Sequence, residues 1–274
     1  MFSVVIATAL AAASAVCHSV PGAEQLWGTE IRWVFVGELH GTNEIPDAFV
    51  NLACLAAQQK QPVTVALEYP VDEQPWIDAF LVSDGGAKAR AALLAAPFWH
   101  RDFQDGRSSV AFLRMFERLR AMKHRGLIAG VRCFDVSDSS PDRRERNAAM
   151  ADRLVAIQAE TRSRIMVLVG NFHASRSSIA RAGRIIRPAA SLMPRDQTIT
   201  VNVIGNGGTA WDCEQEGCGP HSSGPDRDAR RGIVLETDPA ARWDVTYELG
   251  RRTTAAVPAV PLMKASPSRL KEEF

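Results

Sequence analysis

Apolar residues occur along this chain in short runs, separated by stretches that mix polar and apolar residues. Four of the runs, at residues 31–37, 63–67, 127–134 and 165–170, are followed at once by ionisable or polar side chains. Short apolar runs bounded by polar residues are typical of buried strands. In open α/β sheets, ligands bind outside the carboxyl ends of the strands. We therefore expect the side chains that follow the four runs to converge in one crevice.

The stretches between the runs predict helices, and the alternation predicts the fold. Helical segments are expected at residues 47–59, 72–95, 108–124 and 141–161. Further strands are expected at residues 198–204, 232–236 and 244–249, the last two as a hairpin. Strands that alternate with helices indicate a sheet covered by helices. The expected fold class is α/β, with a central mixed, mostly parallel sheet flanked by helices and a C-terminal antiparallel hairpin at the sheet edge.

Composition and charge favour one globular domain. The chain has 274 residues, of which 46% are hydrophobic and 23% charged, and α/β chains of this size commonly form one domain, expected here at residues 24–255. The 32 basic and 31 acidic residues leave a formal net charge of +1, so no overall field attracts nucleic acid or an anionic membrane. Residues 256–274 are rich in Ala and Pro and are expected to form an extended or disordered tail.

Residues 1–23 predict a signal peptide. An apolar stretch at residues 2–16 contains Ala13-Ser14-Ala15, which fits the small-x-small pattern of a cleavage site. The stretch is too short and alanine-rich for a stable membrane span, so we expect an exported protein, periplasmic or secreted. It carries no Lys or Arg, which leaves a misassigned start or a buried helix as alternatives. Cys17 would suit a lipoprotein, but Val16 is bulkier than the small residue expected before a lipidated Cys.

Cysteine usage agrees with export. Cys213 and Cys218 lie in a Gly-rich segment flanked by Pro, where an oxidising compartment would join them in a disulfide. A zinc knuckle is the competing interpretation, but it needs two further ligands and only His221 is nearby. Cys54 lies in an apolar helical run and Cys133 in a strand, so both are expected to be small buried hydrophobic residues rather than nucleophiles.

The first apolar run leads into a motif that suits a catalytic pair, Gly37-Glu38-Leu39-His40-Gly41-Thr42-Asn43-Glu44. Residues two apart on a strand point to the same face, so Glu38 and His40 can act on one ligand. Glycines on both sides allow tight turns and a close approach of substrate to the backbone. The alternative is a strand end that runs into a helix cap formed by Thr42 or Asn43.

Two later runs end in side chains of the same chemistry. Glu68 follows a run that is apolar on both faces, and a carboxylate placed there requires a cation, a metal or a histidine beside it. The fourth run ends in Gly170-Asn171-Phe172-His173, which repeats the pattern of a glycine followed by a histidine at a strand end. A single such histidine is usually structural, but two in one sheet favour a site.

Asp135 and the loop at residues 98–108 are weaker candidates. Asp135 precedes a Ser- and Asp-rich turn, and its carboxylate is expected to bond the backbone of that turn more readily than a ligand. The loop places aromatic residues beside five ionisable groups and would suit a lid, with Ser108 or Ser109 as a plain helix cap in the alternative interpretation. His100 or Arg107 is expected at the rim of the site, because an acidic cluster needs positive charge nearby.

These motifs together resemble the superfamily that joins erythromycin esterases, ChaN-like haem-binding uptake proteins and the Tiki/TraB proteases. The Gly-Glu-x-His spacing is similar to the ChaN-like branch, and His-Gly-Thr-x-Glu is similar to the esterase branch. The resemblance covers residues 31–250 and implies an α/β fold with a mixed central sheet. The resemblance implies that the functional positions are Glu38, His40, Glu68 and His173. Glu44 and Arg107 match the family pattern less closely. The superfamily includes metal-independent hydrolysis, metal-dependent proteolysis and haem binding.

Two hypotheses follow. In the first, the protein is a hydrolase of a small-molecule or peptide substrate: His40 activates water, Glu38 orients or charges the imidazole, and Glu68 with His173 completes the site. A metal variant uses the same four residues as ligands of a divalent ion that keeps one position open for water. In the second, it is an exported haem- or metal-binding protein. Tyr69 and Tyr247 are the only tyrosines available as haem ligands, and neither lies in an evident apolar slot, so this hypothesis ranks second.

Overall fold

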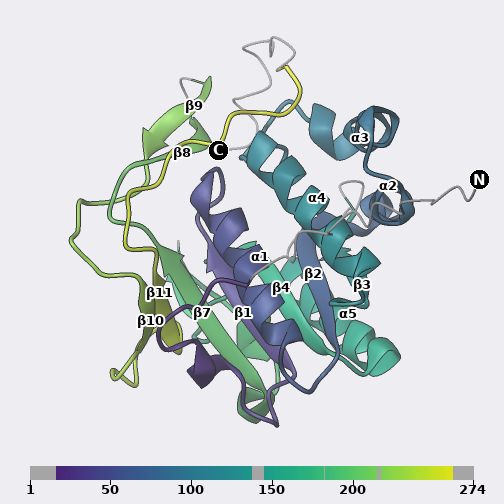
Figure 1. Cartoon of the computed structure of the whole chain (residues 1–274). Helices are drawn as coiled ribbons and strands as arrows, with labels where there is room; N and C mark the ends of the chain where they lie inside the picture. Colours follow the sequence, from purple (N-terminus) through teal and green to yellow (C-terminus); the bar gives the residue numbers. More distant parts are fainter. Residues whose placement is uncertain (1–16, 138–144, 182, 215–216, 262–274) are drawn as a thin grey trace, which may run out of the picture.

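A seven-stranded sheet forms the centre of the molecule (Figure 1). In the computed structural model, which describes residues 17–137, 145–181, 183–214 and 217–261, the strands of this sheet are β1 (Trp33–Glu38), β2 (Val63–Pro70), β3 (Gly130–Asp135), β4 (Arg164–Gly170), β7 (Thr198–Ile204), β10 (Gly232–Leu235) and β11 (Val245–Glu248). Their order is β10-β11-β7-β1-β4-β2-β3. Every neighbouring pair is parallel except β10 and β11 at the edge, which are antiparallel. The predicted α/β fold with its C-terminal edge hairpin is confirmed.

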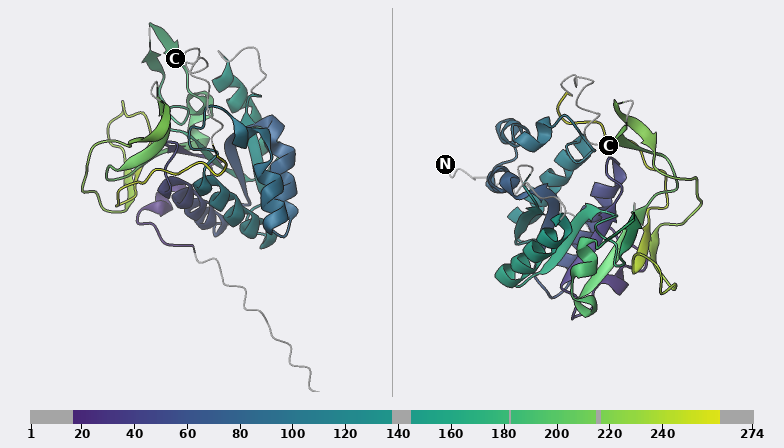
Figure 2. Two further views of the ribbon diagram at one scale, coloured as in Figure 1. Left: turned by 90° about the horizontal axis from the view of Figure 1, so that it is seen from above. Right: turned by 180° about the vertical axis from the view of Figure 1, so that it is seen from behind.

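Helices cover both faces of the sheet (Figure 2). They are α1 (Glu44–Ala57), α2 (Gln74–Val82), α3 (Ala87–Leu94), α4 (Val110–His124) and α5 (Arg146–Thr161), together with the short 3-10 helices η1 (Ala23–Leu26), η2 (Val71–Glu73), η3 (Pro97–His100), η4 (Ala189–Leu192) and η5 (Arg195–Gln197). Two small hairpins complete the fold, β5 (Ile179–Arg181) with β6 (Arg184–Ile186), and β8 (Thr209–Glu214) with β9 (Gly217–Ser222).

The sheet separates two hydrophobic cores because successive strand residues point to opposite faces. In β1, Val34 and Val36 join the core under α1, α2 and α4, whereas Phe35 joins the core under α5. All six residues of β1 are buried, as expected for a parallel strand covered on both sides. The strands therefore hold their carboxyl ends in fixed relative positions.

One detail of the architecture differs from the sequence expectation. The helix predicted at residues 72–95 is divided into α2 and α3, because the chain turns at Gly85 with φ of 71°, a left-handed conformation that glycine adopts without steric cost. Strand β4 lies between β1 and β2 and pairs with both. The start of the helix predicted at residues 141–161 lies outside the described residues, and α5 is observed from Arg146.

The N-terminal segment packs across α1, and this corrects the expectation for Cys54. Cys17 and Cys54 form a disulfide with a Cα–Cα distance of 5.5 Å, so Cys54 is buried but is not a plain thiol. The pairing brings together positions 37 residues apart, which sequence spacing did not reveal. A Cys17 sulfur bonded in a disulfide is not available for a lipid thioether. Residues 1–16, with the predicted cleavage site, lie outside the described part of the chain.

Neighbouring residues fix this segment further. Asn51 accepts a hydrogen bond from the His18 amide at 2.7 Å and donates one to the His18 carbonyl at 2.7 Å. Val20 and Ala23 are buried in the core, so the packed structure includes residues before position 24. No helix in the described ranges is both long enough and apolar enough to cross a lipid bilayer.

Candidate active site

The strand order brings four predicted strand ends to one stretch of the sheet edge. β1, β4, β2 and β3 are consecutive neighbours, and all run in the same direction. Their last residues include Glu38, Gly170 and Asp135, and Glu68 lies two residues before the end of β2. Parallel strands share their carboxyl edge, so these residues and the loops that follow them lie around one region.

His40 is held by Glu38, as the two-residue spacing predicted. The Nδ1 atom of His40 lies 2.9 Å from Oε1 of Glu38. The Nε2 atom lies 3.6 Å from Oε2 of Glu68, and the side chain retains 23% exposure, whereas the Glu38 side chain retains 1%. Oε2 of Glu38 is buried without a hydrogen-bond partner among the described residues. Nε2 of His40 is thus the nitrogen of the pair that is not bonded to Glu38, and it faces the Glu68 carboxylate.

Gly170 gives the His40 ring its space. The Gly170 amide donates a hydrogen bond to Oε2 of Glu68 at 2.6 Å. A Cβ atom at this position would lie 3.0 Å from Nε2 of His40 and 3.5 Å from Oε2 of Glu68. A larger residue would press on the imidazole, which would have to shift, so the glycine at the end of β4 lets the His40 ring lie close to the strand.

Glu68 lies at the centre of the cluster, surrounded by cationic groups. Its Oε1 atom is 2.6 Å from Nη2 of Arg146, 3.1 Å from Nη1 of Arg107 and 3.8 Å from Nε2 of His173. Burial alone would raise the pKa of Glu68, but the positive charges outweigh it, Arg107 most strongly, and hold that pKa well below its usual range. The carboxylate is therefore ionised at neutral pH. This meets the sequence expectation that a buried Glu68 needs a cation or histidine partner.

The two histidines are in opposite electrostatic environments. Burial would lower the pKa of His40, but Glu38 and Glu68 together raise it above its ordinary value. Burial lowers the pKa of His173 to about 4. Arg146 lowers this pKa further, and Glu68 raises it by less than burial lowers it. Paired groups whose pKa values are pushed apart are a mark of acid/base assignments in active sites. The two carboxylates therefore favour protonation of His40, whereas His173 stays neutral at neutral pH.

His173 has both ring nitrogens engaged. Nδ1 lies 2.6 Å from Oδ1 of Asn147, and Nε2 lies 3.3 Å from Nη1 of Arg146. Because a guanidinium only donates, Nε2 is the acceptor and Nδ1 carries the proton that is donated to Asn147. This tautomer follows from the partners. His173 therefore orients Arg146 instead of offering a free nitrogen to a ligand.

Arg146 and Arg107 enter the site from opposite sides. Arg146, in the first turn of α5, donates to Asp135 through Nε at 2.7 Å and Nη2 at 2.6 Å. Arg107 donates to Asp105 through Nη2 at 2.5 Å and to the Glu68 carbonyl through Nη1 at 2.8 Å. Each guanidinium thus bridges Glu68 to a second carboxylate. Such paired, hydrogen-bonded ions are the form in which charges tolerate burial.

The predicted site residues fall into two groups. Glu38, His40, Glu68, His173, Arg107 and Asp135 are connected in one network. Arg107 is buried rather than at the rim, because Asp105 neutralises it inside the molecule. His100 instead bonds the Leu94 carbonyl through Nε2 at 2.8 Å, and Glu44 bonds the Thr254 amide at 2.9 Å. Asp135 also accepts a hydrogen bond from the Val136 amide at 2.8 Å. It therefore binds both the backbone of the turn and the Arg146 side chain.

Sequence reasoning missed Arg146. It lies in the arginine-rich stretch that follows Asp135, which resembles a solvated helix face in the sequence. The signal that could have found it was the shortage of cations for two strand-end carboxylates, Glu68 and Asp135. A helix that begins soon after β3 places its first turn at the same sheet edge, so an arginine there was the natural candidate.

A divalent metal ion does not fit this arrangement. The donor atoms of Glu68 and His173 that a metal would need already face the guanidinium of Arg146. Two fixed positive charges beside the carboxylate would repel a further cation. Within the described ranges, no group of three His, Cys, Asp or Glu side chains is arranged to hold a metal ion. The chemistry of the cluster is therefore derived from its own side chains.

Tyrosine ligation of haem does not fit either. Tyr69 is buried, its hydroxyl donates to the Arg107 carbonyl, and burial raises its pKa well above the usual range. The hydroxyl of Tyr247 is also buried in its strand and accepts a hydrogen bond from Nε of Arg231 at 3.3 Å. Neither phenol is placed to form a phenolate ligand.

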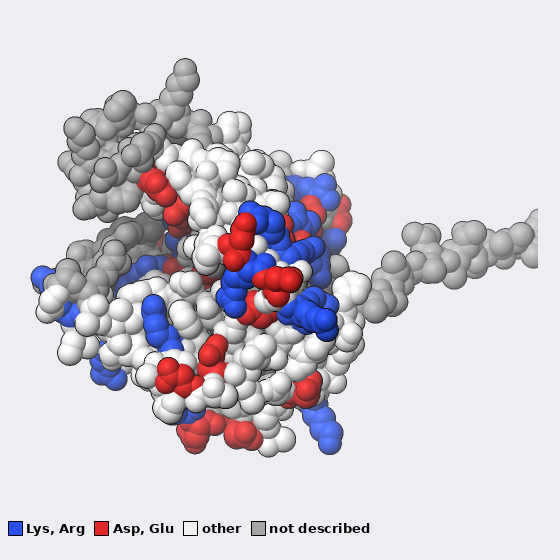
Figure 3. Space-filling model, turned by 90° about the vertical axis from the view of Figure 1, so that its left-hand side faces the viewer, with Lys and Arg blue, Asp and Glu red and all other residues white. Residues whose placement is uncertain are grey.

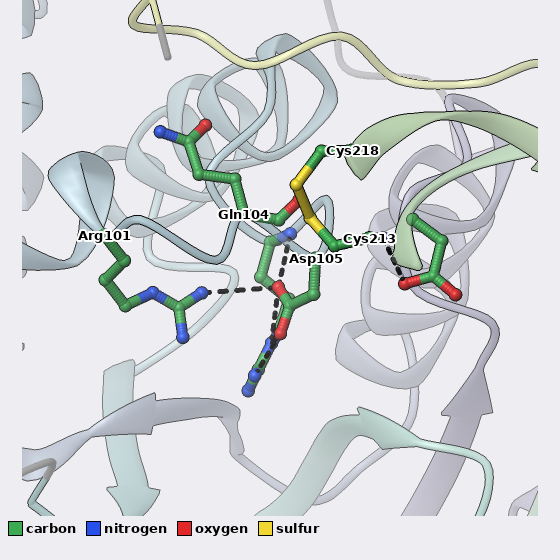
Figure 4. The surroundings of a disulfide bond; sticks show 7 residues. Arg101, Gln104, Asp105, Cys213 and Cys218 are labelled. Carbon is green, nitrogen blue, oxygen red and sulfur yellow. Dashed lines mark hydrogen bonds and ion pairs between the residues drawn. A yellow bond between two sulfur atoms is a disulfide. The ribbon is translucent and has the colours of Figure 1, made fainter. Parts of the chain in front are cut away.

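The β8–β9 hairpin lies against the loop that carries Asp105 (Figure 4). Cys213 and Cys218 form a disulfide across the hairpin, so the predicted clip is confirmed and the zinc alternative is wrong. Sγ of Cys213 lies 3.4 Å from the Gln104 carbonyl, and the Trp211 amide donates to the Gly41 carbonyl at 2.7 Å. Gly41 has φ of 82° and leaves no room for a Cβ beside Trp211. The hairpin therefore braces both loops that border the site.

We expect peptide mapping without reduction to find Cys213 joined to Cys218 and Cys17 joined to Cys54. Two disulfides are typical of proteins in an oxidising compartment. The measurement is mass spectrometry of a digest prepared with thiols blocked. The buried Cys133, which has no cysteine partner, is the internal control and should carry the blocking group only after unfolding. Free thiols at Cys213 and Cys218 in secreted protein would contradict the brace.

A small pocket lies near the end of β1. Its volume is about 190 Å³, and its walls include Leu39 and Thr42 from the first motif and Asn171 from the loop after β4. Val203 and Thr253 close its other side. Neither Glu38 nor His40 lines this pocket, so it is a separate feature from the cluster.

No protein-family model and no curated protein matches the sequence. Solved structures with a similar fold include a succinoglycan biosynthesis protein, with a TM-score of 0.63, 10% identity and coverage of 83% of this chain and 89% of that one. Another is the H289N mutant of the erythromycin esterase EreC in its open conformation, with a TM-score of 0.59, 9% identity and coverage of 86% and 93%. The chain has the erythromycin esterase-like fold. The fold implied by the resemblance to erythromycin esterases is thereby confirmed.

Proposed function

We propose that the protein is a metal-independent hydrolase that cleaves a carboxylic ester, with His40 as general base. The observation that carries the proposal is the Glu38–His40 pair. Nδ1 of His40 is bonded to Glu38, and Nε2 belongs to a partly exposed ring. A base held by a carboxylate in one tautomer is the usual arrangement for activating a nucleophile. Esterase chemistry is supported by the fold shared with an erythromycin esterase.

In the proposed reaction, Nε2 of His40 takes a proton from water while the water oxygen attacks the ester carbonyl carbon. The carbonyl oxygen becomes an alkoxide, and Arg146, whose side chain is 25% exposed, is the cation placed to stabilise it. Collapse of this intermediate breaks the bond to the alcohol oxygen. His40 then returns its proton to the departing alcohol, which leaves a carboxylic acid and a neutral imidazole.

The remaining residues serve that step by position and charge. Ionised Glu68, 3.6 Å from Nε2, stabilises the imidazolium that forms during the reaction. His173 and Asp135 hold Arg146 at the edge of β3 and β4. Arg107 neutralises Glu68 from the buried side, so that the carboxylate keeps a fixed geometry.

Ester hydrolysis is expected to persist in excess chelator and to depend on one ionisation. His40 works as a base only when neutral, and its pKa is raised above the ordinary 6.5, so kcat/KM should fall as pH decreases through a value above 6.5. The measurement is turnover of a panel of chromogenic esters, with peptides in parallel, across pH and with or without chelator. Activity that chelation removes and a divalent ion restores would contradict the metal-independent mechanism. A panel without any turnover would contradict the esterase.

A further inference from the structure

A second, larger groove lies away from the Glu68 cluster. Its volume is about 790 Å³, within the range of small-molecule sites in proteins. One side is formed by Arg114 and Arg118 of α4, and the other by Arg231 before β10 and Arg251 after β11. The β10–β11 side of the molecule carries a concentration of basic side chains mixed with acidic ones (Figure 3).

The positive charge of this groove is only partly compensated. Among the described residues that line it, Asp47 is the sole carboxylate. Asp47 serves two arginines, at 3.0 Å from Nη2 of Arg114 and 3.2 Å from Nη1 of Arg118. One negative charge against four guanidinium groups leaves a local excess of positive charge, in a chain whose formal net charge is only +1. Arginines four residues apart on a helix repel each other, so a bound anion would relieve an unfavourable arrangement.

Among the described residues, the two arginines of the β10–β11 side have no acidic partner. Arg231 donates to the Tyr247 hydroxyl at 3.3 Å and to the Ser19 carbonyl at 2.9 Å, both of them neutral groups. The Arg251 side chain has no hydrogen bond or ion pair with any other residue in the described part of the chain. A guanidinium presents a planar set of donors that matches carboxylate and phosphate oxygens. These groups therefore have the capacity to bind an anion.

The walls of the groove are fixed before any ligand binds. The segment that carries His18 is held to α1 by the Cys17–Cys54 disulfide and by the two hydrogen bonds between His18 and Asn51. The Ile233 amide donates to the Pro21 carbonyl at 2.8 Å, which ties the same segment to β10. A preformed site loses less conformational entropy on binding. The disulfide thus has a role in shaping the groove as well as in stability.

We propose that this groove binds a small anion that carries at least two negatively charged groups, one bound by the α4 arginines and one by Arg231 and Arg251. Carboxylate and phosphate share the required chemistry. A single charge would satisfy only one side of the groove, which is why the ligand must be multivalent. Tyr247, the one Phe, Tyr or Trp residue of the described lining, is 1% exposed and offers no surface for a nucleobase to stack on. The site is independent of the proposed hydrolysis.

The test is isothermal titration calorimetry of the full chain, disulfides intact, with tripolyphosphate and with citrate at low salt. We expect at least one of them to bind with a stoichiometry of one, more weakly as salt is added. Arg251→Gln should weaken binding by at least about tenfold, the loss of one charged hydrogen-bonding group. Arg252→Gln is the matched control, because Arg252 is the adjacent exposed arginine, pairs with Asp226 and does not line the groove. The Arg252→Gln variant should bind the anion with the affinity of the wild type.

A third variant is expected to bind more tightly, a result that loss of folding could not produce. Asp47→Asn removes the competing carboxylate from Arg114 and Arg118, so it should tighten binding of the same anion. Preference for tripolyphosphate would identify a phosphate ligand, and preference for citrate a polycarboxylate. The proposal is overturned if neither anion binds, if Arg251→Gln and Arg252→Gln weaken binding equally, or if Asp47→Asn does not tighten it.

Discussion

Replacing His40 by alanine is expected to lower kcat/KM for ester hydrolysis by about two to four orders of magnitude, the usual contribution of a proton-transfer group. In the proposed reaction, His40 both accepts the proton of water and returns it to the alcohol, so its loss removes two steps. Nothing else in the described network can substitute. Glu68 is ionised but held by two arginines, and both nitrogens of His173 are engaged.

The measurement is steady-state kinetics of the wild type and the variant on the same ester, with His100→Ala as the matched control. His100 has the same chemistry, but it is exposed and contacts the Leu94 carbonyl, so its removal should leave the rate unchanged. Removal of His40 also takes a partner from buried Glu38, a loss of about 1–3 kcal/mol of stability, so folding is checked by circular dichroism. Partial recovery of the rate by added imidazole would confirm the role of the base. Wild-type turnover by folded His40→Ala would contradict it.

The strands and the polar residues at their ends could be predicted because their signals are local. The runs in β1, β2 and β4 are buried on both faces, and the run in the edge strand β3 is buried in part. Each run stops where the chain reaches the polar sheet edge. The two-residue spacing of Glu38 and His40 predicts that both side chains point to the same face, whatever the order of the strands in the sheet. For Glu68, the cost of burying an unpaired carboxylate was enough to require cationic partners, and the structure supplies them in Arg107 and Arg146.

What could not be predicted depends on contacts between distant parts of the chain. The position of β4 between β1 and β2 brings Gly170 to the His40 ring, and no local pattern encodes that order. Arg107 was expected at the rim, but it is buried through its contacts with Glu68 of β2, which lies far away in the sequence. The Cys17–Cys54 disulfide has the same origin, since it needs the N-terminal segment to cross α1.

Glu68→Gln is expected to lower the free energy of unfolding at neutral pH by about 3–5 kcal/mol, the cost of removing one partner from a buried ion pair. Glutamine keeps the shape of the side chain and can still accept the Gly170 amide. The variant therefore isolates the charge, which leaves Arg107 and Arg146 facing a neutral group. Glu160→Gln is the matched control: Glu160 pairs with Arg132, but its side chain is 66% exposed, and an exposed pair contributes about 1 kcal/mol or less.

Chemical denaturation of both variants at several pH values tests the cause as well as the size of this effect. The pKa of Glu68 in the folded protein is lowered from its ordinary value of 4.5. Its ionised form therefore stabilises the fold at pH values above 4.5, and that contribution decreases as the pH falls further toward the folded-state pKa. The difference between wild type and Glu68→Gln should accordingly be largest at neutral pH and shrink in acid. A difference that is small at neutral pH, or that does not change with pH, would show that the central carboxylate is not held by the charges of Arg107 and Arg146.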